Sequence, residues 1–111
     1  MGMDVIGIAP DHECGVRFRV DMAGWRQLWD VTAEYSDGAI TPDLYHAGQS
    51  NAGAGLDAAT SSAVAHALQR HHHAAMRRMR TRGGADDGSI RTHPLLAWIS
   101  FLKRCGGCKI L

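Results

Sequence analysis

Residues 16–32 read VRFRVDMAGWRQLWDVT, and within this stretch the spacing of the apolar residues changes from two to about 3.6. The segment Val16–Val20 alternates strictly, with Arg17 and Arg19 on the face opposite its apolar residues, as in a β-strand. Asp21 is a suitable N-cap for a helix with the apolar stripe Met22, Trp25, Leu28, Trp29 and Thr32. A strand that leads directly into an amphipathic helix predicts an α+β fold.

The rest of the chain supplies partners for this strand and this helix. Asp4–Ile8 has the character of a strand, and the turn-rich residues 10–15 would close a hairpin with the strand that follows. Two more helices are predicted, one from Asp57 to about Arg80 and one that starts at Thr92–Pro94 with Pro94 in its first turn, and Cys108–Leu111 would form a short terminal strand. Residues 36–56 are predicted to form a long loop.

These elements predict a single domain over residues 1–111. Its sheet would be small and antiparallel or mixed, made of the N-terminal hairpin plus the C-terminal strand. About three helices would cover one face of the sheet. Arg17 and Arg19 would then project from the open face.

Composition limits the classes of protein to be considered. The sequence contains no apolar run long enough to span a membrane, and its N-terminus has neither a basic start nor an apolar signal core. We therefore expect a cytoplasmic protein without a membrane partner. The net charge of +1 is unevenly divided, since the first half is acidic and the second half basic. This division could steer an anionic partner to the second half, or the two halves could neutralise each other on packing.

The run Ala47–Leu56 is rich in glycine and leads through Asp57 into the predicted second helix. Backbone N–H groups at such a helix start attract anions. Asn51, Gly53 and Gly55 would allow the backbone to approach a ligand closely. The alternative interpretation is structural, in which the glycines only make turns and the Asp57 carboxylate caps the helix.

Arginine and tryptophan side chains could complete an anion site. Arg17, Arg19 and Arg26 could grip phosphates through bidentate hydrogen bonds, and Trp25 could stack on a base. For these groups to form one anion site, the side chains and the glycine-rich run would have to lie close together in the fold. The alternative is that the arginines form a solvated face and that Trp25 belongs to the core.

The three cysteines of the chain do not suggest a disulfide framework, because their number is odd. Cys105 and Cys108 have the spacing of half a zinc site, and His12 with Cys14 could supply the other half. We favour the alternative that both are small buried residues beside a glycine turn and bind no metal. A redox role is disfavoured, because the pair follows a predicted helix C-terminus, where the dipole raises a thiol pKa.

Five short motifs follow one another in the chain: MGMDVxGxxP at residues 1–10, GxxFR at 15–19, WRxLW at 25–29, NxGxGL at 51–56 and FLxxCGG at 101–107. Their combination resembles a family of small uncharacterised bacterial and phage proteins. The resemblance implies a phage or prophage setting, in which small proteins bind a host protein or sequester a signalling molecule. It implies no catalytic residues. Cys108 stands where the tail of the family more often carries an aromatic residue, so a metal role for Cys108 is not implied.

The patterns together predict a non-enzymatic binding protein of phage or prophage type. It would capture a small anionic, nucleotide-like ligand, such as a host defence signal, without a cofactor. A protein–protein inhibitor of a host enzyme is the first alternative. A zinc-stabilised nucleic-acid binder is the second, although no aromatic residues interleave with the basic run at 77–82. The sequence leaves the oligomeric state open, a homo-oligomer included.

Overall fold

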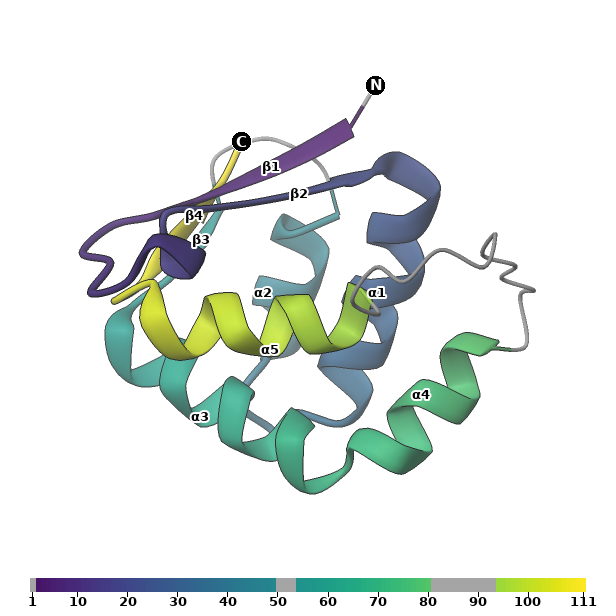
Figure 1. Cartoon of the computed structure of the whole chain (residues 1–111). Helices are drawn as coiled ribbons and strands as arrows, with labels where there is room; N and C mark the ends of the chain where they lie inside the picture. Colours follow the sequence, from purple (N-terminus) through teal and green to yellow (C-terminus); the bar gives the residue numbers. More distant parts are fainter. Residues whose placement is uncertain (1, 50–53, 81–93) are drawn as a thin grey trace.

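The computed structural model describes residues 2–49, 54–80 and 94–111. The order of the elements along the chain is β1 (Gly2–Gly7), the 3₁₀-helix η1 (Glu13–Gly15), β2 (Arg17–Asp21), α1 (Met22–Glu34), α2 (Pro42–Ala47), β3 (Gly55–Leu56), α3 (Ala58–Arg70), α4 (His72–Arg80), α5 (Pro94–Arg104) and β4 (Cys108–Ile110). The sheet lies along one side of the molecule and the helices lie on the other (Figure 1). None of the described helices is long and apolar enough to cross a bilayer.

The sheet has the strand order β2-β1-β4-β3, and every neighbouring pair is antiparallel. The hairpin of β1 and β2 and the C-terminal β4 confirm the predicted α+β arrangement. β3 is an addition that the sequence did not predict. It lies at the edge beyond β4, where Gly55 pairs with Lys109 and Leu56 with Cys108. The prediction of a structureless loop over residues 36–56 was therefore wrong, since its described part also contains α2.

Two buried indole groups explain why α2 forms where a loop was expected. The Nε1–H of Trp25 donates to the carbonyl of Gly48 at 2.9 Å, and that of Trp29 donates to the carbonyl of Tyr45 at 2.8 Å. The N-terminus of α2 is capped by Thr41, whose side chain accepts from the backbone N–H of Leu44. Docking on α1 thus satisfies two donors that would otherwise be buried without partners.

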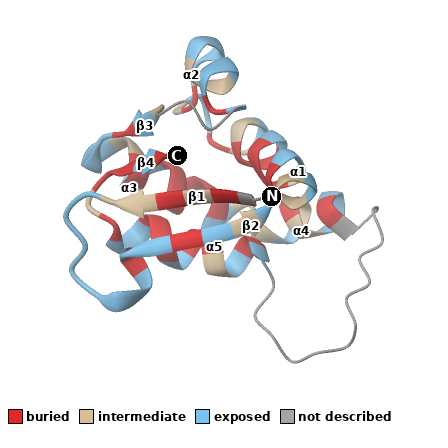
Figure 2. Cartoon of the chain, turned by 90° about the horizontal axis from the view of Figure 1, so that it is seen from above, coloured by how far each residue is buried: buried red, intermediate tan, exposed pale blue. Residues whose placement is uncertain are grey.

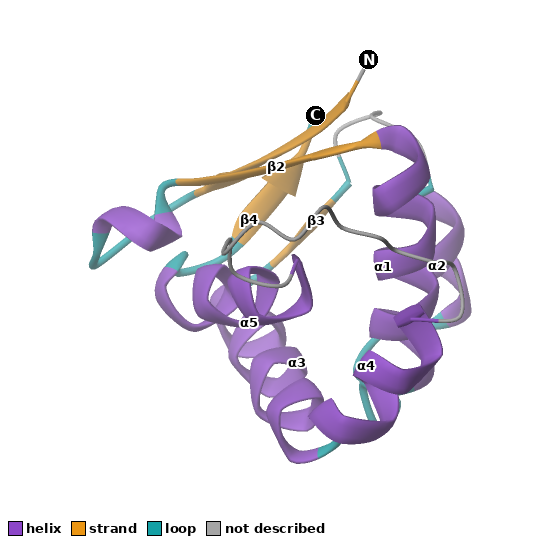
Figure 3. Cartoon of the chain, turned by 45° about the vertical axis from the view of Figure 1, so that its right-hand side comes forward, coloured by secondary structure: helices purple, strands orange, loops and turns teal. Residues whose placement is uncertain are grey.

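The core lies between the sheet and the helices, and Figure 2 shows buried segments in both. Met3 and Val5 project inward from β1, and Phe18 projects inward from β2. Trp98 of α5 lies at the centre, packed 4.9 Å from the ring of Phe18 and edge-on to Trp25. Helices α3 and α5 lie beneath the sheet, and α1 descends from the end of β2 (Figure 3). Aromatic packing of this kind buries more apolar area per residue than any other.

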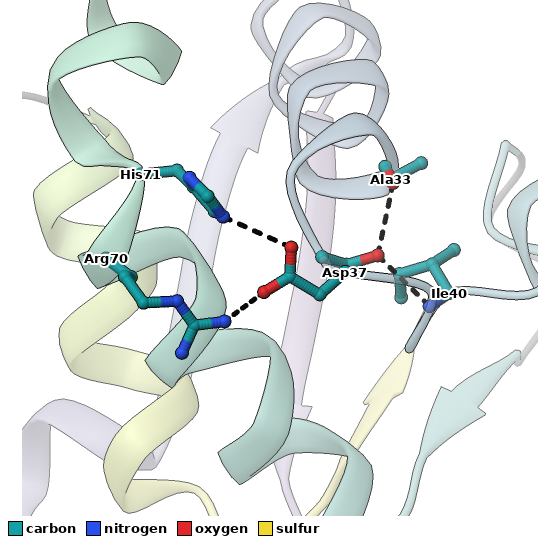
Figure 4. A network of polar contacts seen from close by, with 6 residues as sticks. Ala33, Asp37, Ile40, Arg70 and His71 are labelled. Carbon is teal, nitrogen blue, oxygen red and sulfur yellow. Dashed lines mark hydrogen bonds and ion pairs between the residues drawn. The ribbon is translucent and has the colours of Figure 1, made fainter.

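The predicted helix over residues 57–80 is broken into α3 and α4. The break falls at His71, which caps the end of α3. Arg70 and His71 both contact the carboxylate of Asp37 in the turn after α1, with a distance of 3.1 Å from His71 (Figure 4). A change of direction here lets α4 pack against α1, where Arg78 pairs with Glu34. Tertiary contacts, which the helical periodicity does not report, therefore set the break.

Candidate functional site

The face of the sheet that points away from the helices is the candidate functional site. Directly paired residues project from the same face of a sheet. Ile6 of β1 pairs with Arg17 of β2 on one side and with Lys109 of β4 on the other. These three residues form a row across the centre of the sheet, and both basic side chains are exposed. Two strand spacings, about 10 Å, separate the backbones of the two basic residues.

A second row places Arg19 beside Asp4 on the same face. Asp4 Oδ1 lies 3.2 Å from Arg17 Nη2 and 3.6 Å from Arg19 Nε, so two guanidinium groups share one carboxylate oxygen. The arginine side chains are nevertheless 54% and 65% exposed. Asp4 thus holds two cations side by side without covering them. We call Asp4, Arg17, Arg19 and Lys109 the basic face.

The prediction that Arg17 and Arg19 project from an open face is confirmed by this register. Lys109 and Asp4 were missed. The alternation of Cys108, Lys109 and Ile110 signalled that Lys109 points away from the core. The pairing of β4 with β1, which the sequence does not report, was needed to place Lys109 near the arginines.

The glycine-rich run was predicted to converge with the arginines, and of its three predicted ligand-binding residues the structure describes Gly55. Asn51 and Gly53 lie outside the described residues. Gly55 lies in β3, at the edge of the sheet opposite to the β2 arginines, and pairs with Lys109. Gly55 is therefore next to Lys109, not next to Arg19.

The N-terminus of α3 is already occupied by a carboxylate of the chain. Asp57 Oδ1 accepts from the backbone N–H of Thr60 at 2.7 Å. This hydrogen bond lowers the pKa of Asp57, so the side chain is charged at neutral pH. A fixed negative charge at a helix start repels a second anion. The structural interpretation of Asp57 as a cap is the one that the geometry supports.

Trp25 cannot stack on a ligand in this structure, which corrects the prediction. The residue is 0% exposed and its indole N–H is bonded to Gly48. Its ring stacks on Trp29 at a centroid distance of 5.2 Å, within the core. Arg26 is exposed on α1 and is not part of the sheet.

A hollow lies beside the hairpin loop and has a volume of about 230 Å³. It is lined by His12, Cys14, Ser100, Lys103 and Arg104. His12 Nδ1 accepts from the backbone N–H of Cys14 at 3.2 Å, and the Cys14 thiol points to the carbonyl of Ser100 at 3.8 Å. One imidazole nitrogen is therefore engaged by the backbone, and the hydrogen bond of the thiol goes to a carbonyl and not to the imidazole, as a general base would require.

The alternative zinc set is not assembled. His12 and Cys14 are exposed on the hairpin loop, whereas Cys105 and Cys108 are buried in the core. Across the described ranges 2–49, 54–80 and 94–111, no three His, Cys, Asp or Glu side chains are grouped so as to hold a metal ion. The loop does approach Cys105, because the backbone N–H of Ala9 donates to the Cys105 carbonyl at 3.0 Å. The side chains of His12 and Cys14 nevertheless stay at the surface, and those of the other two cysteines stay buried.

Comparisons with protein-family models, with curated proteins and with solved structures found no significant match.

Proposed function

We propose that the protein binds a small anionic, nucleotide-like ligand on the open face of its sheet. The observation that carries the proposal is the arrangement of Arg17 and Arg19 around Asp4 Oδ1, with Lys109 in the same row as Arg17 on the other side of Ile6. Three cations and one carboxylate leave the basic face with a net positive charge.

The energies favour a phosphate over the internal ion pairs. An exposed ion pair such as Arg17–Asp4 contributes only about 0–1 kcal/mol. A hydrogen bond between a guanidinium and a charged phosphate oxygen contributes about 1.5–3 kcal/mol and is often bidentate. A ligand phosphate can therefore recruit both arginines without a large loss. Asp4 keeps the two guanidinium groups close together before the ligand arrives, which lowers the entropic cost of binding.

The exposed part of Ile6 gives the same face an apolar strip between Arg17 and Lys109. A nucleoside offers an apolar ring face beside its phosphates, so a ligand of this class matches both features. The motif resemblance supports a setting in a phage or its bacterial host, where such a ligand would be a cytoplasmic signal. For that role it is sufficient that the protein binds the ligand, without catalysing a reaction.

Calorimetry with mono-, di- and cyclic nucleotides tests the proposal. Arg17→Ala, Arg19→Ala and Lys109→Ala should each weaken binding about tenfold or more. Arg70→Ala is the matched control, because it removes the same charge from an exposed ion pair on the helical side, with Asp37 as its partner.

Asp4→Asn provides a test in the opposite direction. Removal of the acid from the basic face should tighten binding several-fold, because a repulsive charge is lost and the amide can still accept hydrogen bonds. A gain of affinity cannot be produced by misfolding. The proposal fails if no nucleotide binds, or if the Arg70 variant loses as much affinity as the basic-face variants.

A protein–protein inhibitor is the second candidate. Ile8 and Val16 are 65% and 49% exposed on neighbouring ends of the hairpin, and the outer edge of β2 has no strand partner among the described residues. A partner could pair with that edge and cover both apolar side chains. Nucleotide binding would favour the first candidate. A stable complex with a host enzyme that is lost in an Ile8→Asp/Val16→Asp variant would favour the second.

A further inference from the structure

Cys105 and Cys108 flank the turn that connects α5 to β4. Both are free thiols, and their residues are 0% and 1% exposed. Gly106 and Gly107 between them have φ values of 63° and 96°, which only glycine adopts readily. The two glycines let the chain reverse at once, so both thiols end up inside the molecule.

The turn is held in place by hydrogen bonds from the two residues that follow β1. The backbone N–H of Ala9 donates to the carbonyl of Cys105 at 3.0 Å, and that of Ile8 donates to the carbonyl of Gly107 at 2.8 Å. A Cβ on Gly106 would lie 2.3 Å from the carbonyl oxygen of Ala9. Ile8 and Ala9 are themselves exposed.

The buried hydroxyl of Ser61 is a second observation that indicates a role for this turn beyond packing. It lies in the first turn of α3 and is 1% exposed, and its Oγ has no hydrogen-bond partner among the described residues. A buried hydroxyl without a partner is costly and calls for an explanation. A hydrogen bond from this hydroxyl would favour the charged form of either thiol, so Ser61 lowers the pKa of both cysteines. It is thus positioned to donate to a thiolate.

The two thiols differ in acidity. The hydrogen bond from Cys108 is the main cause that lowers the pKa of Cys105 to about 6, with smaller contributions from Ser61 and from the backbone N–H of Gly107. Burial acts in the opposite direction. The pKa of Cys108 is raised by its interaction with Cys105 and by burial. The pKa of Cys105 is thus lowered even though the residue follows the C-terminus of α5.

We propose that Cys105 and Cys108 form a redox-active dithiol, which closes to an intramolecular disulfide by exchange with a low-molecular-weight disulfide. The Cys105 thiolate attacks one sulfur of the small disulfide, which forms a mixed disulfide and releases a small thiolate. The Cys108 sulfur then attacks the Cys105 sulfur and expels the second small thiolate. Two protein thiols and one small disulfide become one protein disulfide and two small thiols, which take up both protons.

The experiment uses the full chain with Cys14→Ser, which removes the exposed third thiol. The protein is equilibrated with mixtures of oxidised and reduced glutathione, quenched with acid, alkylated after denaturation and weighed by mass spectrometry. A second sample is refolded from denaturant in the same mixtures, so that slow access to the native core does not limit the reaction. The expected product on both routes is the intramolecular disulfide in a folded chain.

Single variants identify the attacking thiol. In the same background, Cys108→Ser should stop at the mixed disulfide on Cys105, whereas Cys105→Ser should remain largely unreacted near neutral pH. Two alkylatable thiols on both routes would overturn the proposal. So would a disulfide found only in chains that have lost their native circular dichroism spectrum.

Ser61→Ala separates a redox role from a packing role. The groups that shift the pKa of the Cys105 thiol are Cys108 from β4, Ser61 from α3 and the backbone of the turn, and the thiol itself donates to the carbonyl of Leu102 in α5 at 3.6 Å. Loss of the hydroxyl should move the midpoint of the exchange rate against pH upward from about 6. The melting temperature should stay unchanged or rise, because an unpartnered buried polar group is removed. A midpoint that stays in place would show that Ser61 does not support the thiolate.

Discussion

Thr32→Val tests the hydrogen bond that joins α1 to α5 at the centre of the core. Thr32 and Trp98 are both 0% exposed. Thr32 Oγ1 donates to the carbonyl of Leu28 at 2.6 Å and accepts from Trp98 Nε1 at 2.9 Å. Valine has nearly the same shape as threonine but offers no acceptor. The variant therefore leaves the indole N–H of Trp98 buried without a partner.

The cost can be worked from these contacts. The carbonyl of Leu28 keeps its helical N–H partner, so only one group is orphaned by the substitution. A buried donor without a partner costs about 1–3 kcal/mol. For a domain of this size, each kcal/mol lowers the melting temperature by about 4 °C. We expect Thr32→Val to melt about 4–12 °C below the unchanged protein.

A double-mutant cycle with Trp98→Phe identifies the cause. Phenylalanine removes the N–H donor, so Thr32→Val should cost close to nothing in that background. The measurement is the free energy of unfolding from urea titrations of all four proteins. A coupling energy of about 1–3 kcal/mol is expected, by the same estimate of an orphaned donor. Equal costs of Thr32→Val in both backgrounds would refute the reasoning.

Two further predictions concern stability. Gly48→Ala should destabilise the fold by about 1–3 kcal/mol, because the new Cβ would lie 2.3 Å from the ring of Trp29; thermal unfolding checks this, and an unchanged midpoint would contradict the docking of α2. Acid should also destabilise the fold, because Arg70 and then His71 lower the pKa of Asp37. A lowered folded pKa gives stability that is complete above the unfolded value and is lost as the pH falls through the folded value. Melting temperatures should therefore drop from about pH 5 downward, and they should drop less in Asp37→Asn.

Short-range patterns predicted the strands and the apolar faces of the helices, because burial on one side leaves a period in the sequence. Trp25, Leu28, Trp29 and Thr32 are buried as their spacing indicated. Val16 is 49% exposed, because β2 begins at Arg17 and the preceding residue belongs to the hairpin turn. Predictions failed where a local segment is held by distant groups.

The position of α2 illustrates the limit. Its residues carry no strong helical period, and the helix is fixed by indole donors from α1. The same limit applies to the basic face. The alternation of β2 showed that Arg17 points outward, but strand pairing decides that Asp4 and Lys109 lie beside it. Ser61 carried no signal at all, because the role proposed for it depends on a turn that lies over forty residues away in the sequence.

The two proposed sites meet in β4, and the alternation of that strand predicts that they act independently. Lys109 projects from the open face, whereas Cys108 and Ile110 project into the core. The register of β4 is held by hydrogen bonds to β1 and to Ala54, none of which involves a thiol. Closure of a disulfide within the turn should therefore leave Lys109 in place. We expect reduced and oxidised Cys14→Ser protein to bind a nucleotide with affinities within about twofold, measured by calorimetry, since a shift below 0.5 kcal/mol corresponds to that ratio. A tenfold difference would show instead that the dithiol controls the basic face, and Lys109→Ala should then abolish the difference.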